Sequence, residues 1–304
     1  MTRPPSGEQF VIHNDTHAVT VVEVGAGLRS YSFRGRPVLD GYAEAAVCDG
    51  ARGQTLLPWP NRIAGGSYEF DGVAHQLALT EPDNGAAIHG LTRWVNWHRT
   101  ENTEDRVVLR YVLHPQPGWP GLLECEVEYR LDDRGLTVST RARNAGAEPC
   151  PYGAGAHPYL TVGTPLIDQA TLTVPADRYY LNDEHKIPFG VEAVDGTGFD
   201  FREPRPLGDR QLDVAYTALR RDPDGRARAR LANPDGPTVS LWVDAAYGYL
   251  EIFTGDSLPN PDRRRTGLGV EPMTCAPNAF RSGDGLIVLA PGQSHVAGWG
   301  IEPG

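Results

Sequence analysis

The sequence of 304 residues predicts an all-β protein, built as a sandwich or a barrel with few and short helices. Short runs of alternating or β-branched residues recur at roughly 8- to 12-residue intervals between turn signals. No stretch of about a dozen residues keeps helical apolar spacing without an interruption by Gly or Pro. The 35 Gly and 26 Pro lie between the strand-like runs, where they indicate turns. Because no linker or internal repeat is visible, we expect residues 1–304 to form a single domain.

The predicted strands follow one another through most of the chain. The clearest are Gly7–Asn14, His17–Val24, Leu28–Phe33, Val107–Leu113, Leu122–Leu131 and Leu136–Arg143. The last two are separated by Asp132-Asp-Arg-Gly135, which is typical of a hairpin. Three further strands are separated by Pro-Asp-Gly turns, and we predict that they pair in succession as a meander: Asp213–Leu219, Ala227–Leu231 and Thr238–Val243.

Composition narrows the function classes. The formal net charge of −11 opposes binding to nucleic acid or to an anionic membrane. The first ten residues lack an apolar signal region, and no run of about 18 apolar residues occurs. We therefore expect a cytoplasmic protein. As a separate expectation, it is a monomer or a homodimer. The four cysteines are far apart, which favours reduced, unpaired thiols: Cys48, Cys125, Cys150 and Cys275.

The first candidate for chemistry is Glu271, in the segment Leu268-Gly-Val-Glu271-Pro-Met. It ends a short apolar run and precedes a proline, which cannot donate to a sheet ladder. We therefore predict that a strand ends or bulges at Glu271. Its carboxylate should sit at the mouth of that strand.

The second candidate is His157, which lies between a glycine-rich segment and Pro158 in Tyr152-Gly-Ala-Gly-Ala-His157-Pro-Tyr159. Histidine is the side chain best suited to give or take a proton near neutral pH. A lone histidine is more often structural. Together with Glu271, however, it would provide an imidazole and a carboxylate for proton transfer at two oxygens.

Three other loops carry candidate binding residues. Asn61 and Arg62 lie among prolines and glycines, where a guanidinium offers forked donors to oxygen-rich ligands, although it could equally pair with a surface carboxylate. His89 precedes Gly90, and the following Trp94 and Trp97 are interpreted as core residues. Asp213 begins a predicted strand and could be a ligand-binding acid or a turn residue.

Taken in order, these motifs resemble the aldose 1-epimerase family over nearly the whole chain. They are Asn61-Arg62-Ile63, His89-Gly90, His157-Pro-Tyr159, Asp213 and Gly269-Val-Glu271-Pro-Met273. The resemblance implies a large antiparallel β-sandwich of the galactose mutarotase-like kind, an open cleft, and no metal or organic cofactor. It implies that a small-molecule sugar is the substrate, with Glu271 as general base and His157 as general acid. The residues implied to bind the sugar are Asn61, Arg62, His89, Tyr159, Asp213 and Glu251.

Two departures concern the sugar. Glu251 stands where galactose-active members commonly carry Gln, and an acid accepts hydrogen bonds where an amide also donates. The segment His89-Gly-Leu-Thr-Arg93 resembles glucose-6-phosphate 1-epimerases, relatives that act on an anionic sugar. Arg62, Arg93 and the run Arg263–Arg265 could bind a phosphate or sulfonate, although the run is interpreted as a solvated loop.

Two other function classes remain open. A glycoside hydrolase or lyase would need a second carboxylate across the scissile bond from Glu271, for which Asp213 or Glu251 is the candidate. A non-catalytic carbohydrate-binding protein would keep the aromatic and arginine contacts but would have no use for His157.

Overall fold

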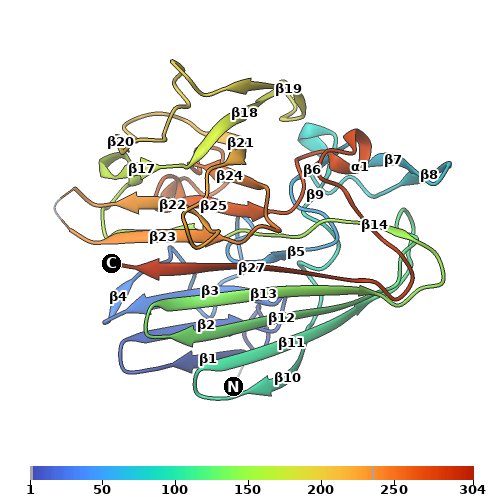
Figure 1. Cartoon of the computed structure of the whole chain (residues 1–304). Helices are drawn as coiled ribbons and strands as arrows, with labels where there is room; N and C mark the ends of the chain where they lie inside the picture. The colour runs from blue at the N-terminus through green and yellow to red at the C-terminus, as the bar shows by residue number, and fades with distance from the viewer. Residues whose placement is uncertain (1–2, 235) are drawn as a thin grey trace.

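The computed structural model describes residues 3–234 and 236–304 and consists almost entirely of antiparallel strands (Figure 1). Its sheets are not closed into a barrel. The predicted all-β class and the scarcity of helix are therefore confirmed. Within the described residues the helical elements are one short α-helix and three 3₁₀ turns: α1 (Ala279–Ser282), η1 (Pro82–Asn84), η2 (Ile167–Gln169) and η3 (Pro261–Arg263).

The largest sheet has nine strands, and its long strand β27 near the C-terminus runs between β13 and β23 (Figure 1). Its strands in order are β10 (His98–Asn102), β11 (Arg106–Leu113), β12 (Leu123–Asp132), β13 (Gly135–Asn144), β27 (Ser294–Pro303), β23 (Thr238–Val243), β22 (Ala227–Ala232), β17 (Thr171–Thr173) and β20 (Arg205–Pro206).

The second sheet has eight strands and carries four of the candidate site residues: Tyr159, Asp213, Glu251 and Glu271. Its strands in order are β19 (Pro188–Ala193), β18 (Ala176–Asn182), β21 (Asp213–Leu219), β24 (Tyr249–Phe253), β25 (Leu268–Met273), β15 (Gly155–Ala156) and β5 (Thr55–Leu56), with β16 (Tyr159–Leu160) also paired to β25.

Smaller sheets complete the fold. One has four strands: β1 (Gln9–His13), β2 (His17–Val22), β3 (Gly27–Phe33) and β4 (Arg36–Pro37). Three have two strands each: β6 (Arg62–Ala64) with β9 (Ala86–Ile88), β7 (Ser67–Phe70) with β8 (Val73–Gln76), and β14 (Cys150–Tyr152) with β26 (Ile287–Leu289).

Period-2 alternation separates a core face from a site face in the eight-stranded sheet. Leu268 and Val270 of β25, like Leu250 and Ile252 of β24, belong to the main hydrophobic core. The residues between them point to the other face, where the polar candidates lie. Packing on one side of the sheet thus holds the functional side chains rigidly on the other.

Two of the predicted strand pairings can be compared directly with the structure. The hairpin of β12 and β13 is confirmed, with Asp132 opposite Gly135. The meander is wrong in its first strand, because β22 pairs with β23 whereas β21 pairs with β18 and β24 in the other sheet. The connection around Asp222–Gly225 therefore carries the chain between sheets. Turn chemistry indicates where a strand stops, but it does not select the partner of the next strand.

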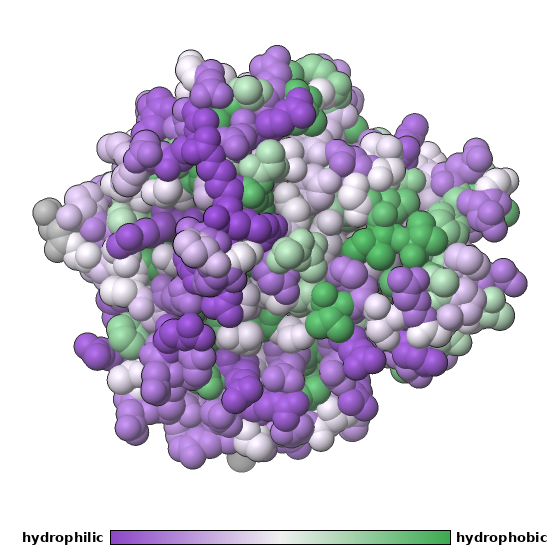
Figure 2. All heavy atoms as spheres, viewed as in Figure 1, coloured by the Kyte–Doolittle hydropathy of each residue, from purple (hydrophilic) through white to green (hydrophobic). Residues whose placement is uncertain are grey.

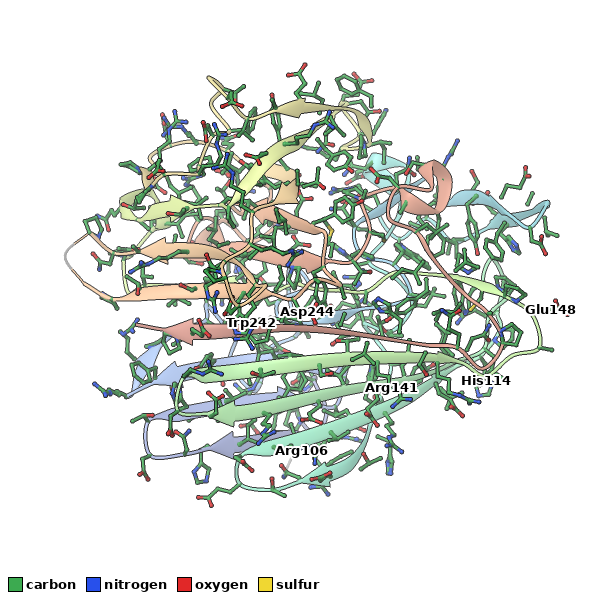
Figure 3. The ribbon with its side chains drawn as sticks, viewed as in Figure 1. Arg106, His114, Arg141, Glu148, Trp242 and Asp244 are labelled. Carbon is green, nitrogen blue, oxygen red and sulfur yellow. The ribbon has the colours of Figure 1, made fainter. Side chains whose placement is uncertain are left out.

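The outer side of the nine-stranded sheet is charged. Arg106 on β11 and Arg141 on β13 extend from this sheet (Figure 3). Arg106 forms ion pairs with Glu101 and Glu128 at 2.6 and 2.8 Å. Figure 2 shows that hydrophilic side chains predominate on the same face of the molecule, in keeping with the net charge of −11.

Among the described residues, no helix has the length and the apolar character that a bilayer crossing requires.

Candidate active site

The two glutamates of the site are cross-strand neighbours. Glu251 on β24 lies directly opposite Glu271 on β25, so the two side chains leave the sheet on the same face. Both are buried, each with 2% exposure. Two carboxylates so placed oppose each other's ionisation.

The other edge of β25 brings in the histidine. Met273 is opposite Gly155 on β15, and Gly269 is opposite Tyr159 on β16. Glu271 lies midway between Gly269 and Met273, and His157 lies midway between Tyr159 and Gly155. The register therefore makes His157 the cross-strand neighbour of Glu271. Sheet register alone therefore places the imidazole and the carboxylate side by side.

The expectation that a strand ends or bulges at Glu271 is wrong, because β25 continues through Pro272 to Met273 in a regular register with β24. On the side of β15 and β16, the Val270 N–H still donates to the Pro158 carbonyl at 3.1 Å. The Thr274 N–H donates to the Ala154 carbonyl at 2.9 Å. The proline therefore removes one rung of the ladder, at the break between β15 and β16. A central strand tolerates that single loss.

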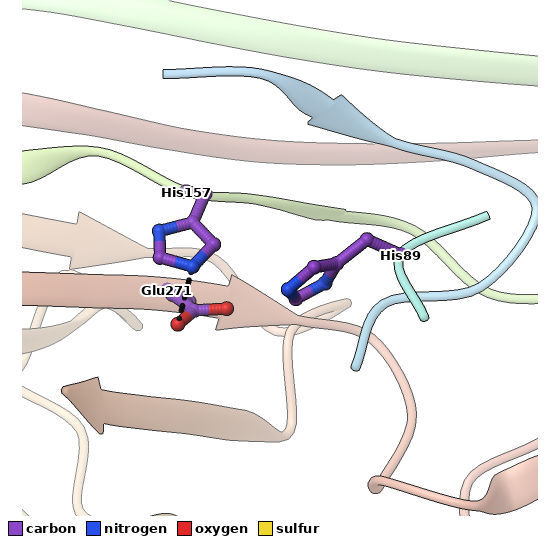
Figure 4. A group of neighbouring side chains, drawn as sticks. All are labelled: His89, His157 and Glu271. Carbon is purple, nitrogen blue, oxygen red and sulfur yellow. Dashed lines mark ion pairs between the residues drawn. The ribbon is translucent and has the colours of Figure 1, made fainter. Parts of the chain in front are cut away.

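His157 and Glu271 are in direct contact, with 3.1 Å between Nε2 of the imidazole and Oε1 of the carboxylate (Figure 4). Their side chains are only 5% and 3% exposed. Nδ1 of His157 and Oε2 of Glu271 have no hydrogen-bond partner in the protein. Buried polar atoms of this kind normally have partners, so these two are available to a ligand.

Burial shifts both groups toward their neutral forms. It lowers the pKa of His157 to about 3, with the nearby Arg93 and Arg52 adding to the effect. It raises the pKa of Glu271 well above its usual range, with Asp213 as the next cause. The pair thus shares one mobile proton across the contact, and the low-charge arrangement of carboxylic acid and neutral imidazole is favoured.

His89 faces the same pair from a separate loop, and its ring meets the ring of His157 edge-on at 5.2 Å between centroids (Figure 4). Its backbone N–H donates to the carbonyl of Asn61 at 2.9 Å, and Nδ1 accepts from the Asn61 N–H at 3.1 Å. Both residues have positive φ, 62° and 54°, which a non-glycine residue adopts at some cost. Because Nδ1 of His89 accepts a hydrogen bond, the proton of the neutral ring lies on Nε2, which can donate to a ligand.

The ligand atoms of His89, His157 and Glu271 lie within 4.8 Å of one another and are the one group of this kind that could hold a metal ion among the described residues. A metal on Nε2 of His89 would move that ring's proton to Nδ1. The Asn61 N–H donates to Nδ1 and opposes this tautomer. The donor set therefore fits hydrogen bonding to a ligand better than metal binding.

Tyr159 supports the imidazole. Its ring stacks on His157 with centroids 4.9 Å apart, and its hydroxyl donates to the Gly50 carbonyl at 2.8 Å. The guanidinium of Arg52 covers the other face of the Tyr159 ring at 4.1 Å, and Asp40 and Asp49 hold this arginine at 3.1 and 3.0 Å. The sequence analysis missed Arg52, since nothing in its local pattern distinguishes it from a surface arginine.

Arg62 and Asp213 line the cavity, and both already have charged partners. Arg62 donates from Nε and Nη2 to the two carboxylate oxygens of Glu81, at 2.6 and 2.9 Å. The Oδ2 atom of Asp213 is 3.6 Å from Nζ of Lys186. Glu81 was also missed, because a partner from a distant loop leaves no mark in the neighbourhood of Arg62.

Glu251 lies behind the cavity wall. It accepts a hydrogen bond from Nδ2 of Asn61 at 3.2 Å, and it is absent from the cavity lining. The implied direct contact of Glu251 with a sugar therefore does not fit its position. Glu251 instead orients Asn61, which does line the cavity.

The Glu251→Gln variant should gain stability relative to the wild type as the pH rises. Burial, and then the nearby Asp213 and Glu271, raise the pKa of Glu251. The wild type has the full stabilisation from protonated Glu251 at pH values below the pKa of this group in the unfolded chain. It loses that stabilisation as the pH rises through the raised pKa of Glu251 in the folded protein. Glutamine keeps the acceptor for Asn61 without ionising, so the difference should reach about 1–3 kcal/mol at high pH.

Thermal unfolding of both proteins at pH 5 and pH 8 tests this. The difference in Tm should be larger at pH 8. The exposed Glu184, with 88% of its side chain accessible, supplies the control variant Glu184→Gln, whose Tm should follow the wild type at both pH values. An equal difference at the two pH values would count against a buried, raised-pKa carboxyl.

These side chains surround a cavity of about 290 Å³. Charged and polar side chains, aromatic rings and aliphatic residues all contribute to the lining. The lining is Cys48, Gly50, Ala51, Asn61, Arg62, Thr80, Glu81, Ile88, His89, Arg93, Trp94, His157, Tyr159, Asp213, Phe253, Ser257, Leu258, Pro259 and Glu271. A chamber with an acid–base pair and several hydrogen-bond donors suits a small polyhydroxylated molecule.

Two expectations about nearby residues need correction. Trp97 is a core residue with 2% exposure, whereas Trp94 is 58% exposed and lines the cavity. The run Arg263–Arg265 is not a simple solvated loop, because its first and last members pair with Asp40 and with Asp168 and Asp256. None of the three arginines lines the cavity.

Comparison with known proteins agrees with this fold. The family described as aldose 1-epimerase matches residues 8–301, and the chain belongs to that family. It is 35% identical to the uncharacterized protein YihR of Escherichia coli K12, over 95% of this chain and 91% of that one. It is 30% identical to the galactose mutarotase of Pongo abelii, over 69% and 66% of the two chains.

A solved structure has the same fold. The aldose epimerase homologue from C. elegans superposes with a TM-score of 0.88 at 19% identity, covering 98% of each chain. The sandwich architecture implied by the family resemblance is therefore confirmed.

Proposed function

We propose that this protein is an aldose 1-epimerase, a mutarotase that interconverts the α and β anomers of a free aldose. The observation that carries the proposal is the buried contact of 3.1 Å between His157 Nε2 and Glu271 Oε1, facing a cavity of sugar size. Family membership supports the reaction class. Glu271 is the proposed general base and His157 the proposed general acid.

The chemistry needs two proton transfers at neighbouring oxygens. Glu271 removes the proton of the C1 hydroxyl while His157 protonates the ring oxygen, and the C1–O bond to the ring opens. Rotation about the C1–C2 bond presents the other face of the aldehyde. Ring closure then returns each proton to the group that supplied it, so one acid and one base serve both directions.

The electrostatics of the pair suit this cycle. Ring opening begins with carboxylate and imidazolium and ends with carboxylic acid and neutral imidazole. Burial favours the second state, because it lowers the pKa of His157 and raises that of Glu271. The site therefore stabilises the open-chain stage. The starting charges return on ring closure, when Glu271 gives its proton to the C1 oxygen and His157 takes the proton of the C5 hydroxyl.

The surrounding residues have proposed roles that follow from their positions. His89 donates from Nε2 to a sugar oxygen, and Asn61, Arg62 and Asp213 bind hydroxyls. Tyr159 holds the His157 ring by stacking. Glu251 positions Asn61 from behind.

Cleavage of a glycoside fits this arrangement less well. A pair of catalytic carboxylates lies on opposite sides of the scissile bond. Glu251 and Glu271 instead project side by side from neighbouring strands. Asp213 is two strands away from Glu271 and has Lys186 as its partner.

The test is anomer exchange itself. Freshly dissolved α-glucose, α-galactose and a hexose 6-phosphate are followed by polarimetry or NMR with and without the protein. The protein should speed the approach of at least one sugar to an unchanged equilibrium. Binding of a sugar without any acceleration would overturn the proposal in favour of a carbohydrate-binding protein, and release of new reducing ends from an oligosaccharide would favour a hydrolase.

A further inference from the structure

We propose that the cavity is built for an aldose that carries an oxyanion, a sulfonate or a phosphate, on an exocyclic carbon, and that Arg93 binds this group. The inference rests on the proposed function and adds the class of substrate. It is carried by one feature of the cavity, a guanidinium that forms no ion pair with a carboxylate of the described residues.

Two arginines line the cavity, and their surroundings differ. Arg62 donates two hydrogen bonds to Glu81, from Nε and Nη2. Arg93 has no carboxylate within 4.0 Å among the described residues, and the polar contact of its guanidinium is one long hydrogen bond of 3.5 Å from Nη2 to the Ile88 carbonyl. Its Nε atom is buried without any partner.

A buried guanidinium with unpaired donors destabilises the protein unless a ligand accepts its hydrogen bonds and balances its charge. Burial lowers the pKa of Arg93, yet an arginine stays charged at any physiological pH. Its donors form a planar fork that matches sulfonate, phosphate or carboxylate oxygens. Hydroxyl groups of a neutral sugar would satisfy the donors without balancing the charge.

The other charged side chains around the cavity have partners of their own, so Arg93 is available to bind a charged group of the substrate. Arg62 is balanced by Glu81, and Asp213 lies beside Lys186. Cys48 also lines the cavity and is a neutral thiol, because burial raises its pKa to about 12. The remaining acid that lines the cavity is Glu271, which the reaction uses.

The position of Arg93 suits a substituent next to the ring oxygen. It follows His89 in one loop, and its charge acts on both His89 and His157, the proposed donor to that oxygen. The exocyclic carbon of a hexopyranose is attached to the carbon beside the ring oxygen, so its substituent points toward this end. Trp94, whose ring centroid is 5.9 Å from the guanidinium carbon, adds an exposed aromatic face at the same place.

The experiment compares glucose, glucose 6-phosphate and 6-deoxy-6-sulfoglucose as substrates of the full-length protein. The wild type should show a kcat/KM for at least one anionic sugar about 10- to 100-fold above that for glucose, as expected for hydrogen bonds to a charged group. In Arg93→Gln this ratio should fall toward one, mainly through a higher KM for the anionic sugar. Arg93→Lys should keep part of the ratio, because lysine retains the charge without the fork.

Arg130→Gln is the matched control, since it removes the same charge from an exposed position on β12 away from the cavity. Its values should equal those of the wild type. A wild-type ratio near one, with glucose still accelerated, would overturn the inference and leave the proposed function standing. An equal loss for all sugars in Arg93→Gln would assign Arg93 a purely structural role and would also overturn it.

Calorimetric titration separates the two proposals. If no sugar is anomerised but the wild type binds an anionic sugar at least tenfold more tightly than Arg93→Gln does, the oxyanion site stands and the epimerase function fails.

Discussion

Replacement of Glu271 by Gln is expected to lower kcat for anomer exchange by about 10²- to 10⁴-fold, the usual contribution of a positioned acid–base group. Glutamine has nearly the same shape and keeps an oxygen near Nε2 of His157, but it cannot take the proton of the C1 hydroxyl. Because the geometry is preserved, KM should change little. Polarimetry or NMR exchange with the preferred sugar measures both constants.

The protein offers a matched surface pair as a control. Glu184 and His185 are exposed neighbours whose side chains approach to 3.7 Å, compared with 3.1 Å in the buried pair. Glu184→Gln should retain the wild-type rate. A Glu271→Gln variant that stays as fast as the wild type would refute Glu271 as the base.

Replacement of His157 by Asn should also reduce kcat by about 10²- to 10⁴-fold, because asparagine has no proton to give to the ring oxygen. The double variant with Glu271→Gln should be about as slow as the slower single variant, since the two groups act as one proton-transfer unit. Rates of both single variants and the double variant, measured under identical conditions, test this non-additivity.

Two observations keep this prediction separate from a folding defect. The Tm of His157→Asn should show a folded protein, and His185→Asn should behave as the wild type in rate. Losses that multiply in the double variant would indicate that His157 and Glu271 act independently, contrary to the shared-proton mechanism.

Much of the fold follows from local patterns. Alternating runs predicted β1, β2, β3 and the β12–β13 hairpin close to their observed bounds, because alternation reports which face is buried. The pairing of β21 was wrong, because partner choice between sheets depends on packing that short-range patterns do not record. The predicted end or bulge of the strand at Pro272 was wrong for a similar reason, because the neighbouring backbone hydrogen bonds hold the strand in place when one is missing.

The candidate site shows the same division. Residue type and order singled out His157, Glu271 and the loops bearing Asn61 and His89, and the structure brings all four to one place. The tautomer of His89 could not be predicted, because it depends on a backbone N–H from another loop.

The sequence by itself determined the β-rich class and the family, and it named the candidates for proton transfer. These follow from local alternation, turn residues and ordered motifs. The tertiary structure alone decided which charges are free to act. Strand register set Glu271 between His157 and Glu251, and loop packing gave Arg62 a carboxylate while leaving Arg93 without one. The physical reason is that desolvation and ion pairing depend on neighbours distant along the chain.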